Sequence, residues 1–349
     1  MLKSARFCKN SLSLFLGPTL SILVSCSALA IREREFASQY QNKVSPFYEN
    51  MGRACQFSGA EGVLIRCRVF VNPTAKASVV VAGGYTEDMH KYAEAAYDLF
   101  AEGYSVFLFD HRGQGYSQRL LADPLVASID DFENLVADLH NYVIQVVKKD
   151  ATEPVFVLAH SMGGAVAAQD IENYPNDFKA AVLAAPMFQI NLRGWPESVA
   201  LFWLRVQAFF GRDDNLVDVL RDPAAYSFEE NVVTHSRIRY ETHRQILRAE
   251  PSLKIYGQTQ RWVRKAIEGS RQARNDATSA RVPILLFQAE TDAYVISDGQ
   301  NEFCKNARHC HVLQIPGSKH EILQESDKAR DTAFAAMLEF FKEQMPDTK

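Results

Sequence analysis

Three side chains of the 349-residue chain could together turn an alcohol into a nucleophile, namely Ser161, Asp292 and His320. A serine hydroxyl attacks a carbonyl only when a neighbouring base takes its proton, and the base needs a carboxylate that orients it. In one large group of hydrolases the three residues follow one another as serine, acid and histidine, which is the order found here. We therefore predict Ser161 as nucleophile, Asp292 as orienting acid and His320 as general base.

The serine stands in a sequence typical of a sharp strand-to-helix turn. The stretch VFVLAHSMGGAVAAQD, residues 155–170, runs from a buried apolar segment through Ser161 and two glycines into an alanine-rich segment. Such a turn lifts the hydroxyl clear of the sheet, and Gly163 permits close approach of a neighbouring backbone. Ala159 replaces the usual first glycine of the turn and is small enough to fit. The peptide N–H of Met162 is predicted to face the same place as the hydroxyl and to hold a developing oxyanion.

A second oxyanion donor is expected after an early strand. The stretch VVVAGGYTEDMHKY supplies a glycine pair directly after the apolar run 79–82, and we predict the backbone N–H of Tyr85 as the donor.

Asp292 follows the apolar run PILLFQAE, and His320 follows HVLQIPG. Both lie just past the carboxyl ends of predicted parallel strands, where ligands bind in open sheets. Glu290, two residues before Asp292, is the alternative acid.

Short apolar segments alternate with helical patterns along most of the chain. The segments are near-continuous apolar runs of the kind found in a parallel sheet covered on both faces. They are Val79–Ala82, Tyr104–Asp110, Val155–His160, Ala180–Pro186, Pro283–Glu290 and His311–Pro316. Between them, apolar residues at three- and four-residue spacing, as from Phe132 to Val147, indicate helices. The pattern predicts an α/β fold with a mostly parallel, doubly wound sheet.

The interval from about Asn191 to Ala280 has helical patterns but no comparable buried strand. It predicts an inserted helical cap over residues 191–280, with the core formed by residues 31–190 and 281–349 after an N-terminal segment of residues 1–30. Within the cap, VALFWLRVQAFF (199–210) is apolar on nearly all sides. That pattern is expected either of a cap helix packed on the sheet or of a helix that touches an acyl chain or a membrane.

Residues 1–30 have the layout of an export signal. Three basic residues precede a mainly apolar stretch from Leu12 to Val24, which is shorter than the roughly 20 residues of a membrane-spanning helix. LVSC, ending at Cys26, resembles the box at which bacterial lipoproteins are lipidated, whereas ALA (28–30) resembles an ordinary cleavage site. We favour the first, which predicts an exported protein of the bacterial cell envelope, anchored at the membrane surface through Cys26. A periplasmic or secreted protein is the alternative.

The cysteines fit an exported protein. Apart from Cys8 and Cys26, which belong to the signal, four remain and could pair in three ways. They are Cys55, Cys67, Cys304 and Cys310. Cys55 and Cys67 flank QFSGAEGVLIR, whose glycines suggest a hairpin turn that could place the two cysteines opposite each other. Four free thiols are the alternative.

Composition and motifs argue against several classes of ligand. A formal net charge of −4 and the absence of a basic run give no reason to expect nucleic acid as a partner. The HRGQG segment that begins at His111 lacks the third glycine of a dinucleotide-binding turn, because Gln118 stands there, so no cofactor is inferred. The group Cys304, His309, Cys310 and His311 matches no zinc spacing, and no metal is expected there.

Four stretches carry a resemblance to a known family. They are YDLFAEGYSVFLFDHRGQGYSQRLLADP (97–124), LAHSMGGA (158–165), AAPMFQI (184–190) and SKHEIL (318–323). Over roughly residues 50–342 the chain resembles the lysophospholipase L2 branch of the α/β-hydrolases, which is akin to monoacylglycerol lipases and S33-type peptidases. One departure is Gly83, where members of the family more often carry histidine. The argument for the backbone N–H of Tyr85 does not depend on that side chain.

The resemblance implies a serine esterase that cleaves lysophospholipids or monoacylglycerol-like lipids through an acyl-enzyme, without a cofactor. An S33-type aminopeptidase is one alternative; it would need an acidic group in the cap to hold a substrate amine, and Glu229, Glu230 and Glu241 keep it open. A non-catalytic lipid-binding lipoprotein with the same fold is another. The complete set of Ser161, Asp292 and His320 argues against it, because a binding protein has no need of them.

Overall fold

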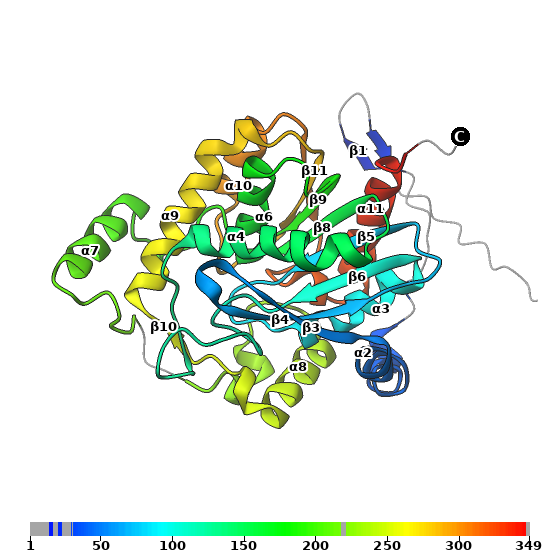
Figure 1. Ribbon diagram of the computed structural model, residues 1–349, viewed down its shortest axis with the longest axis horizontal. Helices are drawn as coiled ribbons and strands as arrows, with labels where there is room; N and C mark the ends of the chain where they lie inside the picture. Colours follow the sequence, from blue (N-terminus) through cyan, green and yellow to red (C-terminus); the bar gives the residue numbers. More distant parts are fainter. Residues whose placement is uncertain (1–13, 17–19, 23–28, 30, 218–220, 347–349) are drawn as a thin grey trace, which may run out of the picture.

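A sheet of eight strands lies between two layers of helices in the computed structural model of the chain (Figure 1). The structure describes residues 14–16, 20–22, 29, 31–217 and 221–346. The predicted lipidation site Cys26 and most of the predicted export signal lie outside the described residues. Within that signal the structure describes two short antiparallel strands, β1 (Leu14–Leu16) and β2 (Leu20–Ile22).

The sheet has the strand order β12-β11-β9-β8-β5-β6-β4-β3. Six of the strands run parallel: β5 (Ala77–Ala82), β6 (Tyr104–Phe109), β8 (Val155–His160), β9 (Ala180–Ala184), β11 (Ile284–Ala289) and β12 (Cys310–Ile315). These are the six predicted apolar segments, and the predicted doubly wound sheet is confirmed. The chain passes from β5 to β6 on one side and then to β8 on the other. The carboxyl ends of β5 and β8 therefore form the switch point at which such sheets bind ligands.

An antiparallel hairpin completes one end of the sheet. It consists of β3 (Arg53–Ser58) and β4 (Leu64–Phe70), and Cys55 lies directly opposite Cys67 in its register. A disulfide joins these two cysteines, as the hairpin argument suggested. A second disulfide joins Cys304 to Cys310, so those two sulfur atoms are not free to bind a metal.

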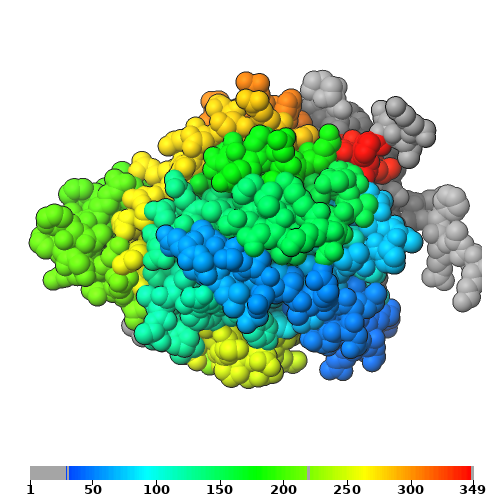
Figure 2. Space-filling model, in the orientation of Figure 1, coloured from blue at the N-terminus to red at the C-terminus, as the bar shows by residue number. Residues whose placement is uncertain are grey.

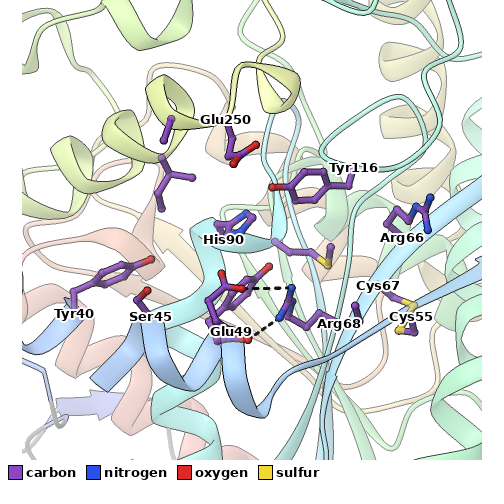
Figure 3. Close-up of a pocket in the computed structure, with 15 residues that line it drawn as sticks. Tyr40, Ser45, Glu49, Cys55, Arg66, Cys67, Arg68, His90, Tyr116 and Glu250 are labelled. Atoms are coloured by element: carbon purple, nitrogen blue, oxygen red, sulfur yellow. Dashed lines mark hydrogen bonds and ion pairs between the residues drawn. A yellow bond between two sulfur atoms is a disulfide. The ribbon is translucent and has the colours of Figure 1, made fainter. Parts of the chain in front are cut away.

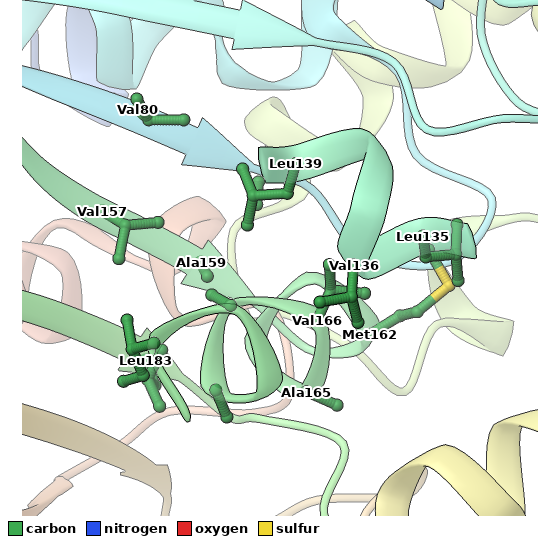
Figure 4. Packing of buried hydrophobic residues seen from close by; sticks show 14 of the residues in the cluster. Val80, Leu135, Val136, Leu139, Val157, Ala159, Met162, Ala165, Val166 and Leu183 are labelled. Carbon is green, nitrogen blue, oxygen red and sulfur yellow. The ribbon is translucent and has the colours of Figure 1, made fainter. Parts of the chain in front are cut away.

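Helices cover both faces of the sheet. One face carries α4 (Phe132–Tyr142), α6 (Met162–Asn173), α9 (Gln260–Asp276) and α10 (Ser297–Asn306), and the other carries α2 (Ser45–Met51), α3 (Ala93–Ala101) and α11 (Asp327–Glu343). Figure 4 shows Leu135 and Leu139 of α4 and Val166 of α6 packed beside the valines of β5 and β8. The alanines of α6 let that helix lie close to the sheet, which fixes the position of its first turn. The helices α1 (Phe36–Gln39) and α5 (Lys148–Asp150) are short.

The interval predicted as a cap contains α7 (Glu197–Phe209), α8 (Arg237–Ala249) and α9. It also contains β10 (Gly257–Gln258), which pairs with β7 (Val126–Ala127). Of the three helices, α9 packs against α4 and α6 beside the sheet, whereas α7 packs chiefly on α9. The boundaries 191–280 stay a prediction. Within the described part of the chain, no helix is both long enough and apolar enough to span a bilayer.

A buried ion pair anchors the HRGQG segment to the helical layer. The Arg112 guanidinium donates to both carboxylate oxygens of Asp138 on α4, over 2.6 and 2.8 Å, and neither side chain is exposed to solvent. The same carboxylate accepts a hydrogen bond from the backbone N–H of Ala60, and Arg112 donates to the Ala60 carbonyl. Two segments far apart in the chain are thus tied to α4 by a single buried pair of charges.

The substitution Asp138→Ala should lower the free energy of unfolding by about 3–5 kcal/mol, because it leaves the Arg112 charge buried and unpaired. Urea denaturation measures the effect. Asp130→Ala is the matched control: Asp130 is exposed, lies 3.7 Å from Arg261, and should cost no more than about 1 kcal/mol. Equal losses in the two variants would contradict the anchoring role of the pair.

Candidate active site

Ser161 occupies the sharp turn between β8 and α6. Its backbone has φ 51° and ψ −115°, a conformation that costs a non-glycine residue about 1–3 kcal/mol. Four backbone hydrogen bonds hold it there. Its N–H donates to the Ala184 carbonyl over 3.0 Å, and its carbonyl accepts from Gly164 and Met187, each over 2.9 Å, and from Ala165 over 3.3 Å. The turn is therefore fixed by α6 and by the end of β9 rather than by the side chain of Ser161.

The three residues predicted to cooperate lie in one hydrogen-bonded chain. The Ser161 Oγ atom lies 3.0 Å from His320 Nε2, and His320 Nδ1 lies 2.8 Å from Asp292 Oδ2. They come from the carboxyl ends of β8, β12 and β11, which the parallel sheet brings to a common edge. The alternative acid, Glu290, instead accepts a hydrogen bond from the backbone N–H of Gly317. Asp292 is the carboxylate that reaches the imidazole.

The environment of Asp292 keeps it ionised and aimed at the imidazole. Burial raises the pKa of this carboxyl, but hydrogen bonds and charge from His320 outweigh burial and hold the pKa below its usual value. The Oδ1 atom accepts from the backbone N–H groups of Tyr294 (2.8 Å) and Val295 (3.0 Å), which leaves Oδ2 for His320. The loops that carry the acid and the histidine are joined by a hydrogen bond from Thr291 N–H to the Ser318 carbonyl, over 3.1 Å.

The turn after β5 lies against the start of α6. A Cβ atom on Gly163 would come within 2.4 Å of the carbonyl oxygens of both Ala82 and Gly83, so only glycine allows this approach. Met162 is the first residue of α6, and its N–H has no acceptor in a preceding turn of the helix. This packing brings the turn that carries Tyr85 to the start of α6. The role of the Tyr85 and Met162 N–H groups as oxyanion donors stays a prediction. The Tyr85 ring also packs on Trp262 of α9, with 3.9 Å between ring centroids.

Two side chains of the HRGQG segment hold this turn in place. The ring of His111 lies with Nε2 3.0 Å from the Gly83 carbonyl, and burial lowers the pKa of His111 to about 4, so the ring is neutral and donates through Nε2. The Gln114 amide donates to the Gly84 carbonyl (3.0 Å) and accepts from the N–H of Thr86 (3.0 Å). The sequence argument excluded only a dinucleotide-binding role for the HRGQG segment and did not predict these contacts with the predicted oxyanion turn.

A buried carboxylate beneath the turn forms the centre of a second network. Glu87 accepts hydrogen bonds from the backbone N–H of Gly84 and the hydroxyl of Tyr92. It also accepts from Lys91 over 2.7 Å and lies 3.1 Å from His160 Nδ1. Burial raises the pKa of Glu87, but His160 and Lys91 outweigh burial and hold it well below its usual range. The sequence offers one signal for this role, an acidic residue two positions after Tyr85 in a glycine-rich turn, but Glu87 is not among the residues predicted from the sequence.

His160 connects this network to the proposed base. Its Nε2 atom lies 3.1 Å from the backbone carbonyl of His320, and its Nδ1 atom faces the ionised Glu87. Because a carbonyl and a carboxylate can only accept, both nitrogens carry hydrogen and the ring is positively charged. Burial lowers the pKa of His160, but the charge and hydrogen bond of Glu87 outweigh it and raise the pKa above 6.5. His160 is thus a hydrogen-bonding neighbour that positions the His320 backbone.

One cavity lies apart from the hydrogen-bonded chain of Ser161. Its volume is about 660 Å³, and Figure 3 shows Arg68, His90 and Tyr116 in its wall together with the Cys55–Cys67 disulfide. None of the three predicted catalytic residues lines it. Ser161 itself is only 8% exposed, so the residues around the hydroxyl leave little open space.

One group of side chains has the atoms that a metal site requires. His140, Asp170 and Asp177 place one donor atom each within 4.8 Å of one another. His140 already shares a 2.6 Å contact with Asp177, and the group lies between α4 and the far end of α6, away from Ser161. It therefore plays no part in the chemistry derived for the candidate site.

The substitution Gly163→Ala should abolish most of the esterase activity while the chain still folds. The added Cβ would force the turn after β5 away from the start of α6 and would displace the proposed donor, the N–H of Tyr85. Loss of one oxyanion donor lowers kcat by a factor of about 10²–10³. Steady-state kinetics on a soluble ester measures the loss, with circular dichroism as the check on folding. Gly62→Ala is the control for the loss of a glycine, since no atom lies within 4 Å of its Cβ position. Activity within about threefold of wild type in Gly163→Ala would refute this account of the turn.

The charge on His160 should make the free energy of unfolding depend on pH. Because folding raises its pKa, the stabilisation is present below the unfolded value of 6.5 and disappears as pH rises through the folded value. The stability difference between wild type and His160→Gln should thus be larger at about pH 5.5 than at about pH 9, measured by urea denaturation. His309→Gln, at an exposed histidine, is the control for the loss of an imidazole elsewhere on the protein. A difference that grows with pH would rule out a charged His160.

Comparison with known proteins shows the family to which the chain belongs. Residues 73–327 match the family model described as serine aminopeptidase, S33. Lysophospholipase L2 of Escherichia coli is 35% identical to this chain over 320 residues, which cover 89% of this chain and 93% of that protein. Monoacylglycerol lipase of Mycolicibacterium smegmatis is 26% identical, and the alignment covers 78% of this chain and 91% of the lipase. The crystal structure of a soluble variant of monoglyceride lipase from Saccharomyces cerevisiae aligns with a TM-score of 0.65 at 17% identity, over 86% of this chain and 98% of that one. The chain therefore belongs to the serine aminopeptidase S33 family of the α/β-hydrolases.

Proposed function

We propose that this protein is a serine esterase that hydrolyses the carboxylic ester of lysophospholipids or of monoacylglycerol-like lipids. The observation that carries the proposal is the hydrogen-bonded chain of Ser161, His320 and Asp292 at the carboxyl edge of the sheet. Relatives named as lysophospholipase L2 and monoacylglycerol lipase support a lipid ester as substrate. The extensive coverage of both sequences supports an activity of the whole chain.

In the first half of the reaction Ser161 Oγ attacks the ester carbonyl as its proton passes to His320 Nε2. The positive charge that develops on the imidazole is stabilised by Asp292 through Nδ1–H. The carbonyl oxygen becomes an oxyanion, for which the N–H groups of Tyr85 and Met162 are the proposed donors. When the tetrahedral intermediate collapses, His320 returns the proton to the leaving alcohol and the acyl group stays on Ser161.

In the second half a water molecule takes the place of the alcohol. His320 removes a proton from this water, the resulting hydroxide attacks the acyl carbonyl, and the same donors hold the second oxyanion. Collapse of that intermediate breaks the bond to Ser161 Oγ, which regains its proton from His320. The products are a free fatty acid and the deacylated alcohol, and the enzyme is restored.

The aminopeptidase alternative receives little support from the acids of the cap. An acid that binds a substrate amine must be free of other cations, yet Glu229 pairs with Arg237 and Glu230 with Arg221, each over 2.6 Å. Glu241 is half-exposed on α8 and is the remaining candidate of the three. A non-catalytic lipoprotein would have no use for the strained backbone of Ser161, which costs free energy without stabilising the fold.

We also propose that the protein is exported and held at the membrane of a bacterial cell envelope by a lipid on Cys26, with a soluble periplasmic or secreted form as the alternative. Two disulfides support an oxidising compartment, because such bonds seldom persist in a reducing cytosol. A lipid anchor would keep the enzyme close to a substrate that itself resides in membranes. The lipidation of Cys26 stays a prediction from its sequence context.

The substitution Ser161→Ala should lower the rate of lysophosphatidylcholine hydrolysis by at least about 10⁴-fold, because no acyl-enzyme can form. Release of fatty acid measures the activity, and a fluorophosphonate probe should label wild type but not the variant. Ser38→Ala, at an exposed hydroxyl, is the control and should retain both properties. Unchanged turnover in Ser161→Ala would remove Ser161 from the mechanism. Faster cleavage of an aminoacyl anilide than of the ester by wild type would favour the aminopeptidase.

A further inference from the structure

A buried carboxylate without a hydrogen-bond partner lies on the last turn of α6, where this helix packs beside α4. Asp170 is fully buried, and within the described part of the chain neither of its carboxylate oxygens accepts a hydrogen bond. An ionised carboxylate is costly to bury without donors, and a protonated one would still have an O–H group to pair. A ligand that is not part of the chain could satisfy this side chain.

Two further donors face the same place. His140 comes from the end of α4 and Asp177 from the loop after α6, and one donor atom from each of them and from Asp170 lie within 4.8 Å of one another. His140 Nδ1 is already 2.6 Å from Asp177 Oδ2. A tetrahedral zinc ion at about 2.1 Å from its ligands needs donor separations of about 3.4 Å. Small side-chain rotations would bring the three donors to that spacing.

Tyr174 holds the three donors in place. Its ring stacks on the imidazole of His140, with 3.7 Å between ring centroids and 11° between the ring planes. Its backbone N–H donates to the Asp170 carbonyl over 2.6 Å, and its carbonyl accepts from the Asp177 N–H over 3.1 Å. Neighbouring groups that orient the ligands in this way are typical of metal sites in proteins.

The charge around the group is suited to a cation. Asp170 and Asp177 are two carboxylates at the carboxyl end of α6, where the partial charge of the helix is also negative. Lys148 lies 3.4 Å from Asp177 Oδ1, but its side chain is 44% exposed and can turn to solvent. Among the described residues, no cationic side chain pairs with Asp170.

The chemistry of the donors selects the class of ion. An imidazole nitrogen together with carboxylate oxygens suits Zn²⁺, whereas Ca²⁺ and Mg²⁺ prefer oxygen ligands alone. Three protein ligands and one water form a common four-coordinate zinc site. The His140 side chain is 28% exposed, and Figures 1 and 2 show α4 and the residues that follow it at the front of the molecule. An ion can therefore enter from solvent on this face.

We propose that His140, Asp170 and Asp177 bind one Zn²⁺ ion, which ties the ends of α4 and α6 to the loop that leads into β9. The ion would replace the proton between His140 Nδ1 and Asp177 Oδ2. Asp170 follows Ser161 by nine residues, about 13 Å along the axis of α6, so the ion stabilises the fold and takes no part in ester cleavage. This inference goes beyond the proposed function and holds whichever ester the protein cleaves.

Calorimetric titration of the full chain with ZnCl₂, after treatment with EDTA and dialysis, tests the proposal. One equivalent should bind with a Kd of about 10 μM or tighter. Zinc at a hundredfold excess over Kd should raise Tm by about 3–6 °C, and CaCl₂ or MgCl₂ at the same concentration should not. The substitutions Asp170→Asn and His140→Gln should each weaken zinc binding more than about tenfold.

His235→Gln is the matched control and should bind zinc as tightly as wild type. His235 also lies beside a buried carboxylate, 3.1 Å from Glu325, but it does not belong to the group of three donors. The proposal is overturned if zinc neither binds wild type nor raises its Tm, or if both variants bind zinc as tightly as wild type does. Tighter binding of Ca²⁺ than of Zn²⁺ would also overturn it. Ester hydrolysis is not measured in this assay, so its outcome is independent of that of Ser161→Ala.

Discussion

A single buried carboxylate, that of Glu87, constrains the arrangement of the site. An ionised carboxylate away from water is stable only when donors surround it, and here a backbone amide, a phenol, an ammonium group and an imidazolium do so. The amide belongs to Gly84 in the turn after β5, and the imidazolium of His160 holds the backbone of His320. Movement of the turn would remove one of the four donors to this buried charge, and movement of the histidine loop would leave the charged ring of His160 without its second acceptor. Both segments are therefore held in register with Ser161.

The same constraint explains why the site is assembled before any substrate arrives. Lys91 bridges Glu87 to Glu321, the residue after His320, over 2.7 and 2.5 Å. From the other side, His111 and Gln114 hold the carbonyls of Gly83 and Gly84, and the N–H groups of Gly84 and Thr86 are bonded to Glu87 and Gln114. The N–H of Tyr85, which lies between them, is the proposed oxyanion donor. Donors that are fixed in advance need no reorganisation when charge develops, and this is the main physical advantage of such a site over water.

Much of this could be predicted from the sequence, because it depends on local pattern. The strands are continuous apolar runs, and the order of Ser161, Asp292 and His320 together with their places after strands was sufficient to bring them to one edge. The hairpin of Cys55 and Cys67 followed from its two glycines. The contacts of Glu87, His111 and Gln114 could not be predicted, because they join segments whose approach is set by the packing of the whole sheet. The same holds for α9, whose pattern shows an amphipathic helix but not that it packs on α4 and α6.

The two disulfides lie at opposite margins of the sheet. One links β3 to β4, the outermost strands at one end, and the other links β12, the outermost strand at the other end, to α10. Open sheets are most vulnerable at such margins, because the unpaired backbone groups of an edge strand can pair with another chain. Cross-linking both margins restricts the fraying that would make these strands available, while β8, the central strand that ends directly before Ser161, remains without a covalent tie. The first consequence of chemical reduction would thus be self-association through the sheet edges rather than a direct loss of the catalytic geometry.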